Sequence, residues 1–497
     1  MLTTLAAPAF AKTWDIEKGD ITVKAGEAEG PNKVKQGDSD FVKDEGDTII
    51  TGTSDKNTVT IEAENKGDKV EVTLKDVNID ASSRNKAAVS VTGSGNTTIK
   101  LDGDNHLTGG NGRSGISSSG SLTISGGETD RLTAQGGSGT DGSGGRGIFS
   151  KDLTISGGTV NANGGDGKNG SGGSGITSLG SLTISGGTVN AAGGSGKDGG
   201  DGIWSGGVTI SSGSTVTANG GRGEDGSGGR GITSDGGRGE DGSGGRGITS
   251  DGGDVTISGG TVNANGGNGN YGNGGDGILS FNHVAISGGT VKSNGGSGTI
   301  SGGNGIISND IDLSGSLELT AKAGSPNGKA LSRVGSELDL NTIKDKLDPG
   351  AKVTVTDANG ETKQVSISRP VEPEGPVIPE ESSSSSDGGS SAPSAPASSL
   401  PGLTVTDKDG QRISYTSIRG NNVLSLRVGR FTASLRASLS TLRQLRAEGI
   451  DTITFQTILC STTLSVDELL AMGGEDAEIV LTHHIRSSTL TVGGKAV

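Results

Sequence analysis

Acidic residues inside glycine-rich segments are the first candidates for chemistry in this sequence. Four of them occur in three such segments: Asp166, Asp198, Asp201 and Asp276. Calcium prefers six to eight oxygen ligands, which converging carboxylates and backbone carbonyls can supply. Calcium binding is therefore one interpretation of these aspartates. The other is a flexible or polyglycine-like flap that stacks on its neighbours and binds no metal.

Aromatic side chains are scarce, at 2% of the residues, and three occur in or beside the glycine-rich segments. Phe149 and Trp204 each follow a Gly-Ile pair, and Tyr271 lies within a segment. Because the C–H face of a sugar ring is apolar, sugars stack on aromatic rings. These residues are candidate carbohydrate contacts. Alternatively, they pack beneath a loop.

Amide and hydroxyl side chains recur at fixed places in a repeated segment that reads Thr-x-Asn. Its asparagines include Asn161, Asn190 and Asn263. Such groups can hydrogen-bond to sugar hydroxyls. They can equally solubilise a sheet surface and hydrogen-bond to one another. A third interpretation, ice binding, needs a flat uncharged array, which Lys292 interrupts.

Catalytic groups are not evident. Arg146, Arg230 and Arg246 precede Gly-Ile pairs, but residues that recur with a repeat are better explained as structural. No nucleophile elbow surrounds any serine, and one cysteine with four scattered histidines gives no transition-metal spacing. The sequence favours a non-catalytic protein, and a polysaccharide lyase or hydrolase is the rival class.

Composition restricts the partners and the architecture. The formal net charge of −15 argues against nucleic acid, which selects basic surfaces. The chain contains 96 glycines without a strict Gly-X-Y period, which excludes collagen. With so few large apolar residues, the chain suits a fold of many thin stacked layers better than one compact core.

A repeat resembling LTISGG-TVNANGG supplies those layers. Its first apolar position falls at Leu122, Leu153, Leu182, Val208, Val255 and Val284. The spacings are 26 to 31 residues, apart from one of 47, which contains an unchanged 16-residue duplication of 220–235 at 236–251. Each period holds three short segments that alternate apolar and polar residues, separated by glycines. Three strands per period predict a mainly β chain folded as a parallel β-helix, or β-solenoid.

The chain divides into four parts. Residues 1–11 resemble the end of a secretory signal peptide, which predicts a secreted or cell-surface protein. Residues 12–368 form the predicted solenoid, with charged capping regions at 13–65 and 335–368. Residues 369–402 are a Pro/Ser-rich linker expected to be disordered. No other apolar stretch approaches 20 residues, so no membrane span is expected.

Residues 403–497 predict a small α+β domain of unknown role that could bind a cell-surface partner. Leu435, Leu439, Leu442 and Leu445 are spaced for one face of a helix that ends at Gly449. A strand is expected over 450–459, and a helix beginning at a capping box at Ser465. Further strands are expected at 479–482 and 490–492.

The solenoid sequence also resembles a known family. The block LTISGG-TVNA…GGDGI, preceded by VTLKDVNIDA and TTIKLDGDNHL, is similar to parallel β-helix polygalacturonate-binding proteins of anaerobic Gram-positive bacteria. These are often named carbohydrate-binding domain-containing proteins, and the similarity covers about residues 45–345. It implies a right-handed helix, binding of a pectin-like acidic polysaccharide, calcium sites and little lyase activity. Family members often carry acidic residues before Gly-Ile, where this chain has Asp201 and Asp276 but Arg, Ser or Asn in other coils.

Two non-catalytic functions therefore remain open, beside the rival class of a polysaccharide lyase or hydrolase. One is a carbohydrate-binding solenoid. The other is a structural or adhesive surface protein, in which the solenoid is a spacer and the C-terminal domain makes the contact.

Overall fold

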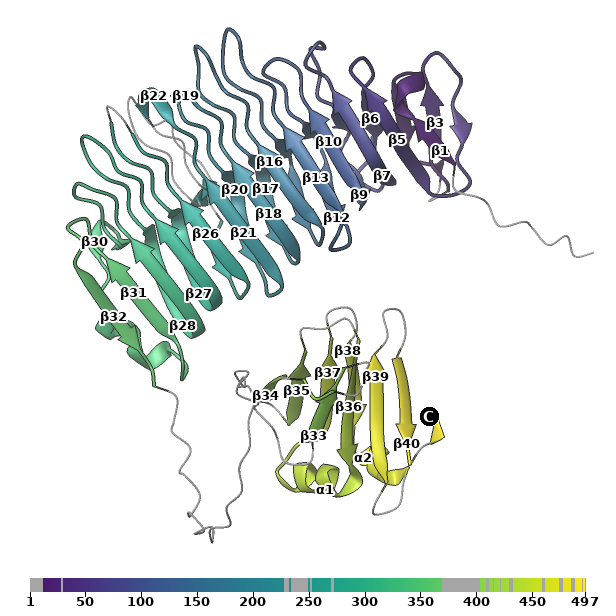
Figure 1. The fold of residues 1–497 in the computed structure, drawn as a ribbon, viewed down its shortest axis with the longest axis vertical. Helices are drawn as coiled ribbons and strands as arrows, with labels where there is room; N and C mark the ends of the chain where they lie inside the picture. Colours follow the sequence, from purple (N-terminus) through teal and green to yellow (C-terminus); the bar gives the residue numbers. More distant parts are fainter. Residues whose placement is uncertain are drawn as a thin grey trace, which may run out of the picture. The chain divides into compact units, whose positions relative to one another are not determined.

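The structure is a computed structural model of the chain (Figure 1). It describes residues 12–27, 30–227, 232–233, 249–250, 253–269, 272–368, 403–407, 411–413, 415–420, 422–428, 432–457, 461–472, 477–483, 488–493 and 495–496. The chain divides into two compact units between residues 374 and 375. The expected signal segment 1–11 and linker 369–402 lie outside the described residues.

The first unit is the predicted parallel β-solenoid, with about 12 turns. Each turn contributes strands to three parallel stacks. The first stack contains β1 (Thr13–Asp15), β5 (Thr48–Ser54), β7 (Lys69–Asp80), β9 (Asn96–Asp102), β12 (Ser121–Ser125), β15 (Asp152–Ile155), β17 (Ile176–Ile184), β20 (Ile203–Ile210), β25 (Val255–Ile257), β27 (Ile278–Asn294) and β28 (Ile306–Lys322).

The second stack runs beside it. It contains the later parts of β5, β7, β27 and β28, together with β10 (Asp104–Thr108), β13 (Arg131–Gln135), β16 (Thr159–Asn163), β18 (Gly187–Ala192), β21 (Ser214–Asn219), β26 (Thr261–Asn265) and β31 (Lys352–Thr356).

The third stack precedes the first in each turn. It contains the first residues of β17, β20, β27 and β28, together with β2 (Ile21–Lys24), β6 (Val59–Glu62), β8 (Val89–Thr92), β11 (Ile116–Ser118), β14 (Ile148–Ser150), β23 (Ile232–Thr233), β24 (Thr249–Ser250) and β29 (Leu331–Arg333).

The predicted register is confirmed. The six apolar positions of the repeat pair directly in sequence order, from Leu122 with Leu153 to Val255 with Val284. Successive strand residues point to opposite faces, so each such position adds one layer to the core. One isoleucine column is completely buried: Ile124, Ile155, Ile184, Ile210, Ile257 and Ile286.

The turn from the first stack to the second depends on glycine. Gly158 and Gly187 occupy equivalent corners, with φ of +77° and +78°. Side chains other than glycine rarely adopt that conformation. The second glycine of the SGG element therefore sets the direction in which the chain enters the second stack.

The predicted capping region 13–65 takes part in the parallel stacks. β1 and β2 pair in parallel with β5 and β6, so residues that the charge pattern assigned to a cap belong to the stacks. Antiparallel additions occur at both ends: β3 (Lys33–Gln36) and β4 (Val42–Lys43) at one, β30 (Ser336–Glu337) and β32 (Thr362–Ser366) at the other. Two 3-10 helices, η1 (Ile16–Lys18) and η3 (Leu340–Lys346), complete these regions.

The glycine-rich segments 136–147, 164–175, 193–202 and 295–305, which we call the glycine flap, connect the second stack to the third. Figure 1 shows loops of this kind stacked along one side of the solenoid. The N–H of Gly145 donates to the carbonyl of Gly137 in its own loop, at 2.8 Å, and the N–H of Gly165 in the next loop donates to Gly145, also at 2.8 Å. Short strands β19 (Gly196–Asp198) and β22 (Gly223–Ser227) join neighbouring loops. The loops are thus hydrogen-bonded within and between turns.

The second unit is an α+β domain with its own buried core. One sheet contains β33 (Leu403–Thr406), β36 (Ala433–Ser438), β39 (Glu478–His483), β40 (Ser488–Val492) and β41 (Lys495–Ala496). The other contains β34 (Thr416–Gly420), β35 (Val423–Arg427), β37 (Thr452–Gln456) and β38 (Ser461–Ser465). The helices are α1 (Leu439–Ala447) and α2 (Val466–Ala471).

Two details of this unit correct the sequence prediction. Leu435 lies on β36 and not on the helix, because Ser438 caps α1 by accepting a hydrogen bond from the N–H of Thr441 at 3.2 Å. The strand expected over 450–459 extends only from Thr452 to Gln456 in the described residues. The cap at Ser465 is confirmed, since its Oγ accepts the N–H of Glu468 at 3.3 Å.

Within the described part of the chain, no helix has the length and apolar character needed to cross a membrane.

Candidate functional site

The second stack carries an ordered row of polar side chains on its outer face. Six residues pair in sequence order along it, and we call them the polar column: Thr133, Asn161, Asn190, Thr217, Asn263 and Lys292. They alternate with fully buried residues such as Val160 and Ala162, so the core fixes the direction in which they point.

The side-chain amides of the asparagines in the polar column make few hydrogen bonds within the protein. The Nδ2 of Asn190 donates to the Oδ1 of Asn161 at 2.9 Å. The amide of Asn263 has no hydrogen bond to any residue that the structure describes. A neighbouring column is linked more fully, because Asn265 donates to Asn219 at 2.9 Å and Asn294 donates to Asn265 at 2.8 Å. The amides therefore link along the stack, as one of the two sequence interpretations expected, and the described residues leave other donors and acceptors of the column without a partner.

The aromatic residues Phe149 and Trp204 occupy one outward row of the third stack, with Thr177 between them. Both are partly buried, while Thr177 is 3% exposed and its hydroxyl has no hydrogen-bond partner among the described residues. The guanidinium of Arg146 lies 5.2 Å from the centre of the Phe149 ring. Desolvation lowers the pKa of Arg146, whose guanidinium nevertheless stays charged at neutral pH. The Phe149 ring thus contacts a side chain of the protein itself, and Tyr271 lies outside the described residues.

Two of the four aspartates are exposed and connect neighbouring loops of the flap. Asp166 accepts the backbone N–H of Ser195 at 2.7 Å, and Asp198 accepts the hydroxyl of Ser171 at 3.3 Å. Each carboxylate therefore bonds to a group one turn away, a role that the sequence did not indicate.

The other two lie at the position before Gly-Ile. Asp276 is 7% exposed and accepts both the backbone N–H and the side-chain amide of Asn304, at 2.6 and 2.8 Å. Asp201 is partly exposed and also has an interaction partner. Among the residues that the structure describes, no group of three or more His, Cys, Asp or Glu is placed to hold a metal ion.

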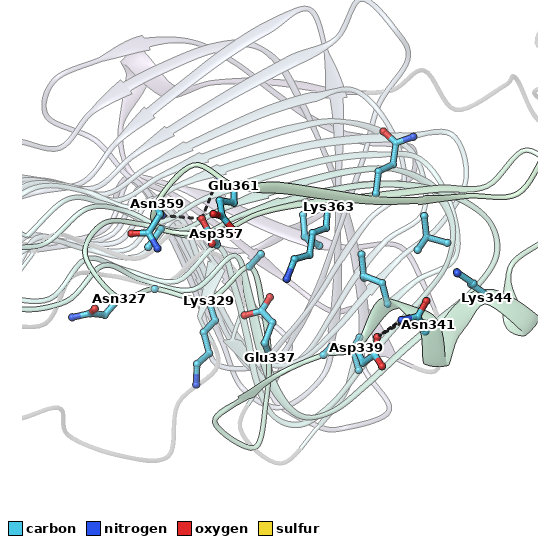
Figure 2. Close-up of a pocket in the computed structure, with 18 residues that line it drawn as sticks. Asn327, Lys329, Glu337, Asp339, Asn341, Lys344, Asp357, Asn359, Glu361 and Lys363 are labelled. Carbon is cyan, nitrogen blue, oxygen red and sulfur yellow. Dashed lines mark hydrogen bonds between the residues drawn. The ribbon is translucent and has the colours of Figure 1, made fainter.

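A pocket of about 790 Å³ lies at the C-terminal end of the solenoid (Figure 2). It is lined by segment 327–330, by β30 and the start of η3, and by β31, β32 and the turn between them. Its apolar wall contains Leu338, Leu340, Val355 and Val365, which are 7 to 9% exposed. These four residues belong to the solenoid core. They line the pocket because no further turn is stacked on the last turn that the structure describes.

Charged side chains of both signs surround this wall. Figure 2 shows Asp357 and Glu361 at one end, Lys363 nearer the middle, and Asp339 and Lys344 at the other end. The sequence analysis assigned residues 335–368 to a cap and missed this pocket. The available signal was the end of the LTISGG pattern and the charged residues of β32 that follow it.

Comparisons with protein-family models, with curated proteins and with solved structures found no match to this chain.

Proposed function

We propose that this chain is a non-catalytic carbohydrate-binding protein that acts outside the cell and binds a polysaccharide along the outer face of the second stack. The observation that supports this most strongly is the polar column, in which partly exposed amides and hydroxyls recur once per turn in constant register.

The repeat matches the chemistry of a polymer. Stacked strands are separated by about 4.8 Å, a distance comparable to the length of one sugar unit. Each turn then offers an equivalent amide or hydroxyl to successive sugars. Because one hydrogen bond contributes only about 1 kcal/mol, affinity would come from many such contacts made together.

Calcium determines whether an acidic polysaccharide can be the ligand. With a net charge of −15, the protein repels an acidic polysaccharide such as pectin unless a cation bridges the two. Asp166, Asp198, Asp201 and Asp276 are the proposed calcium ligands in that case. A neutral polysaccharide would need no calcium.

Affinity electrophoresis of the full chain tests the proposal. The gels contain a panel of polysaccharides that includes polygalacturonate, first with calcium and then with a chelator. We expect retardation on at least one gel, and Asn190→Ala combined with Asn263→Ala should reduce it several-fold. The control is Thr209→Ala combined with Thr256→Ala, on the outer face of the first stack. Trp204→Ala tests the aromatic row separately.

The result with chelator separates acidic from neutral ligands, since only the calcium-bridged complex should be lost. Retardation on none of the gels, or equal loss in the control variant, would contradict the proposal.

The alternative function, an adhesive protein with the solenoid as spacer, is favoured by one observation. The second unit has a separate core of about twenty buried apolar residues. Deleting residues 403–497 distinguishes the two functions. Loss of cell adhesion with intact polysaccharide retardation would favour adhesion through the second unit.

A further inference from the structure

The pocket at the C-terminal end of the solenoid contains charged groups that the protein itself leaves unused. Three of its carboxylates accept backbone N–H groups: Glu337 from Leu331, Asp339 from Asn341, and Asp357 from Asn359 and Glu361, at 2.9 to 3.0 Å. Lys329 donates to the carbonyl of Gly335. By contrast, within the part of the chain that the structure describes, the side chains of Lys344, Lys363 and Glu361 have no hydrogen bond or ion pair. The free charges are therefore of both signs.

Strand geometry orders two of these free charges. Glu361 immediately precedes β32, and Lys363 and Val365 follow at intervals of two residues. Alternate residues of a strand share a face and lie about 7 Å apart. Val365 packs on the core and is only 7% exposed. Glu361, Lys363 and Val365 all line the pocket. Glu361 just before β32 and Lys363 and Val365 within it thus place an anion, a cation and an apolar side chain in that order along the pocket, and Figure 2 shows Lys363 directed into the pocket.

We propose that this pocket binds short apolar peptides with free termini, holding the terminal ammonium at Glu361 and the terminal carboxylate at Lys363. Two extended residues span about 7 Å, which matches the backbone spacing of Glu361 and Lys363 along the strand. The peptide's side chains would cover Leu338, Leu340 and Val355. Lys344 at the far end adds a second cation for the carboxylate. The site is separate from the polar column, and it takes a different ligand.

The pocket has the dimensions for this ligand. Its volume of about 790 Å³ falls in the usual range for small-molecule sites, which combine apolar walls with a few polar anchors. Four carboxylates and three lysines line it, so a zwitterion, with no net charge, fits the balance better than a simple anion or cation.

The test is calorimetric titration of the full chain with the dipeptide Leu-Leu and two capped forms. N-acetyl-Leu-Leu lacks the ammonium, and Leu-Leu-amide lacks the carboxylate. We expect Leu-Leu to bind, and each cap to weaken binding about tenfold, because hydrogen bonds to charged groups are the stronger kind. Gly-Gly should bind much more weakly, since it cannot cover the apolar wall.

Variants assign each charge. Glu361→Gln should weaken Leu-Leu and Leu-Leu-amide but leave N-acetyl-Leu-Leu unchanged. Lys363→Gln should weaken Leu-Leu and N-acetyl-Leu-Leu but leave the amide unchanged, and Lys363→Arg should retain binding. Glu318→Gln and Lys322→Gln, exposed on β28 and outside the pocket lining, are matched controls.

Absence of Leu-Leu binding to the unmodified chain, or equal affinity for the free and capped peptides, would overturn the proposal without any variant. Binding that is insensitive to both pocket variants would do the same. The pocket variants should leave polysaccharide retardation unchanged, so this site and the proposed carbohydrate function fail or succeed separately.

Discussion

Individual glycines of the flap are required by their neighbours rather than by backbone conformation. A Cβ on Gly173 would overlap the carbonyl oxygen of Gly145 in the preceding turn, and one on Gly165 would overlap that of Gly137. Gly142, in the same flap, has nothing within 4 Å of the position that a Cβ would take. The high glycine content is therefore a packing requirement at specific positions.

Gly173→Ala should destabilise the flap by about 1–3 kcal/mol, because the new methyl group forces hydrogen-bonded backbones apart. Hydrogen exchange of the flap amides measures the effect, and it should rise in the loops on either side of residue 173. Gly142→Ala is the control and should leave exchange unchanged or slower, since alanine restricts the unfolded chain. Equal effects from the two substitutions would disprove the packing explanation.

At the level of elements, one solenoid turn accommodates the 16-residue duplication without losing register. Ile232 pairs with Ile203 before it and Ile278 after it. Ser250 likewise pairs with Ser205 and Ser280. β23 and β24 together therefore occupy the place of one strand of the third stack, and the two copies of the repeat supply its two halves.

Deletion of 236–251 should leave the urea midpoint of the solenoid unchanged or raise it. The shortened chain keeps Ile232-Thr233-Ser234 in place of the two half-strands and closes a smaller loop, which costs less entropy. A fall in the midpoint would show that the duplicated copy carries stabilising contacts of its own.

A charged contact joins three elements of the second unit. Arg446 of α1 contacts Asp451 before β37, and its Nε donates to Asp467 of α2 at 2.8 Å. The hydrogen bond from Arg446 lowers the pKa of Asp467 from the ordinary 3.8. A lowered carboxyl pKa stabilises the fold above 3.8, and that contribution is lost as pH falls through the folded-state value.

Acid should therefore loosen α2 in the unmodified chain once pH falls below about 4, and Asp467→Asn should remove this part of the pH dependence. Hydrogen exchange of peptides from α2 gives the measurement. Arg443→Gln, on the exposed face of the same helix, is the control and should behave like the unmodified chain. The effect will be small, since both partners are well exposed, at 41% and 65%.

At the scale of the whole molecule, stability resides in two separate cores. Buried apolar residues form one cluster that extends along the solenoid and another confined to the second unit. The stacked turns contact mainly their neighbours, so their stability is a sum of nearest-neighbour terms. These terms between neighbouring solenoid turns do not include the second unit, whose described residues form two sheets and two helices around a core of their own.

The two units should unfold independently. Both tryptophans, Trp14 and Trp204, lie in the solenoid, so their fluorescence reports that unit alone. Removing residues 369–497 should leave the fluorescence transition in urea unchanged, within about 0.5 kcal/mol. A shift larger than that would demonstrate energetic coupling between the units.

The sequence by itself determined the solenoid, its period and its register. Leu153, Ile155 and Val160 show why: apolar and polar residues alternate over a few positions, and glycines mark the corners, in every turn. Each position then stacks on its equivalent in the next turn. The same reasoning located the polar column and the cap at Ser465. It failed at Leu435, where the heptad-like spacing of leucines continues across a strand–helix boundary that only the cap at Ser438 reveals.

Only the tertiary structure decided what the loop residues contact and what the solenoid ends expose. The bonds of Asp166 and Asp276 join groups 29 and 28 residues apart, which is about one repeat period, but the loop conformation decides which groups these carboxylates meet. The C-terminal pocket exists because repetition stops. In the last described turn, the core residues Val355 and Val365 line this pocket while remaining 7% exposed, and Glu361 and Lys363 lie beside them. No repeated motif carries this arrangement.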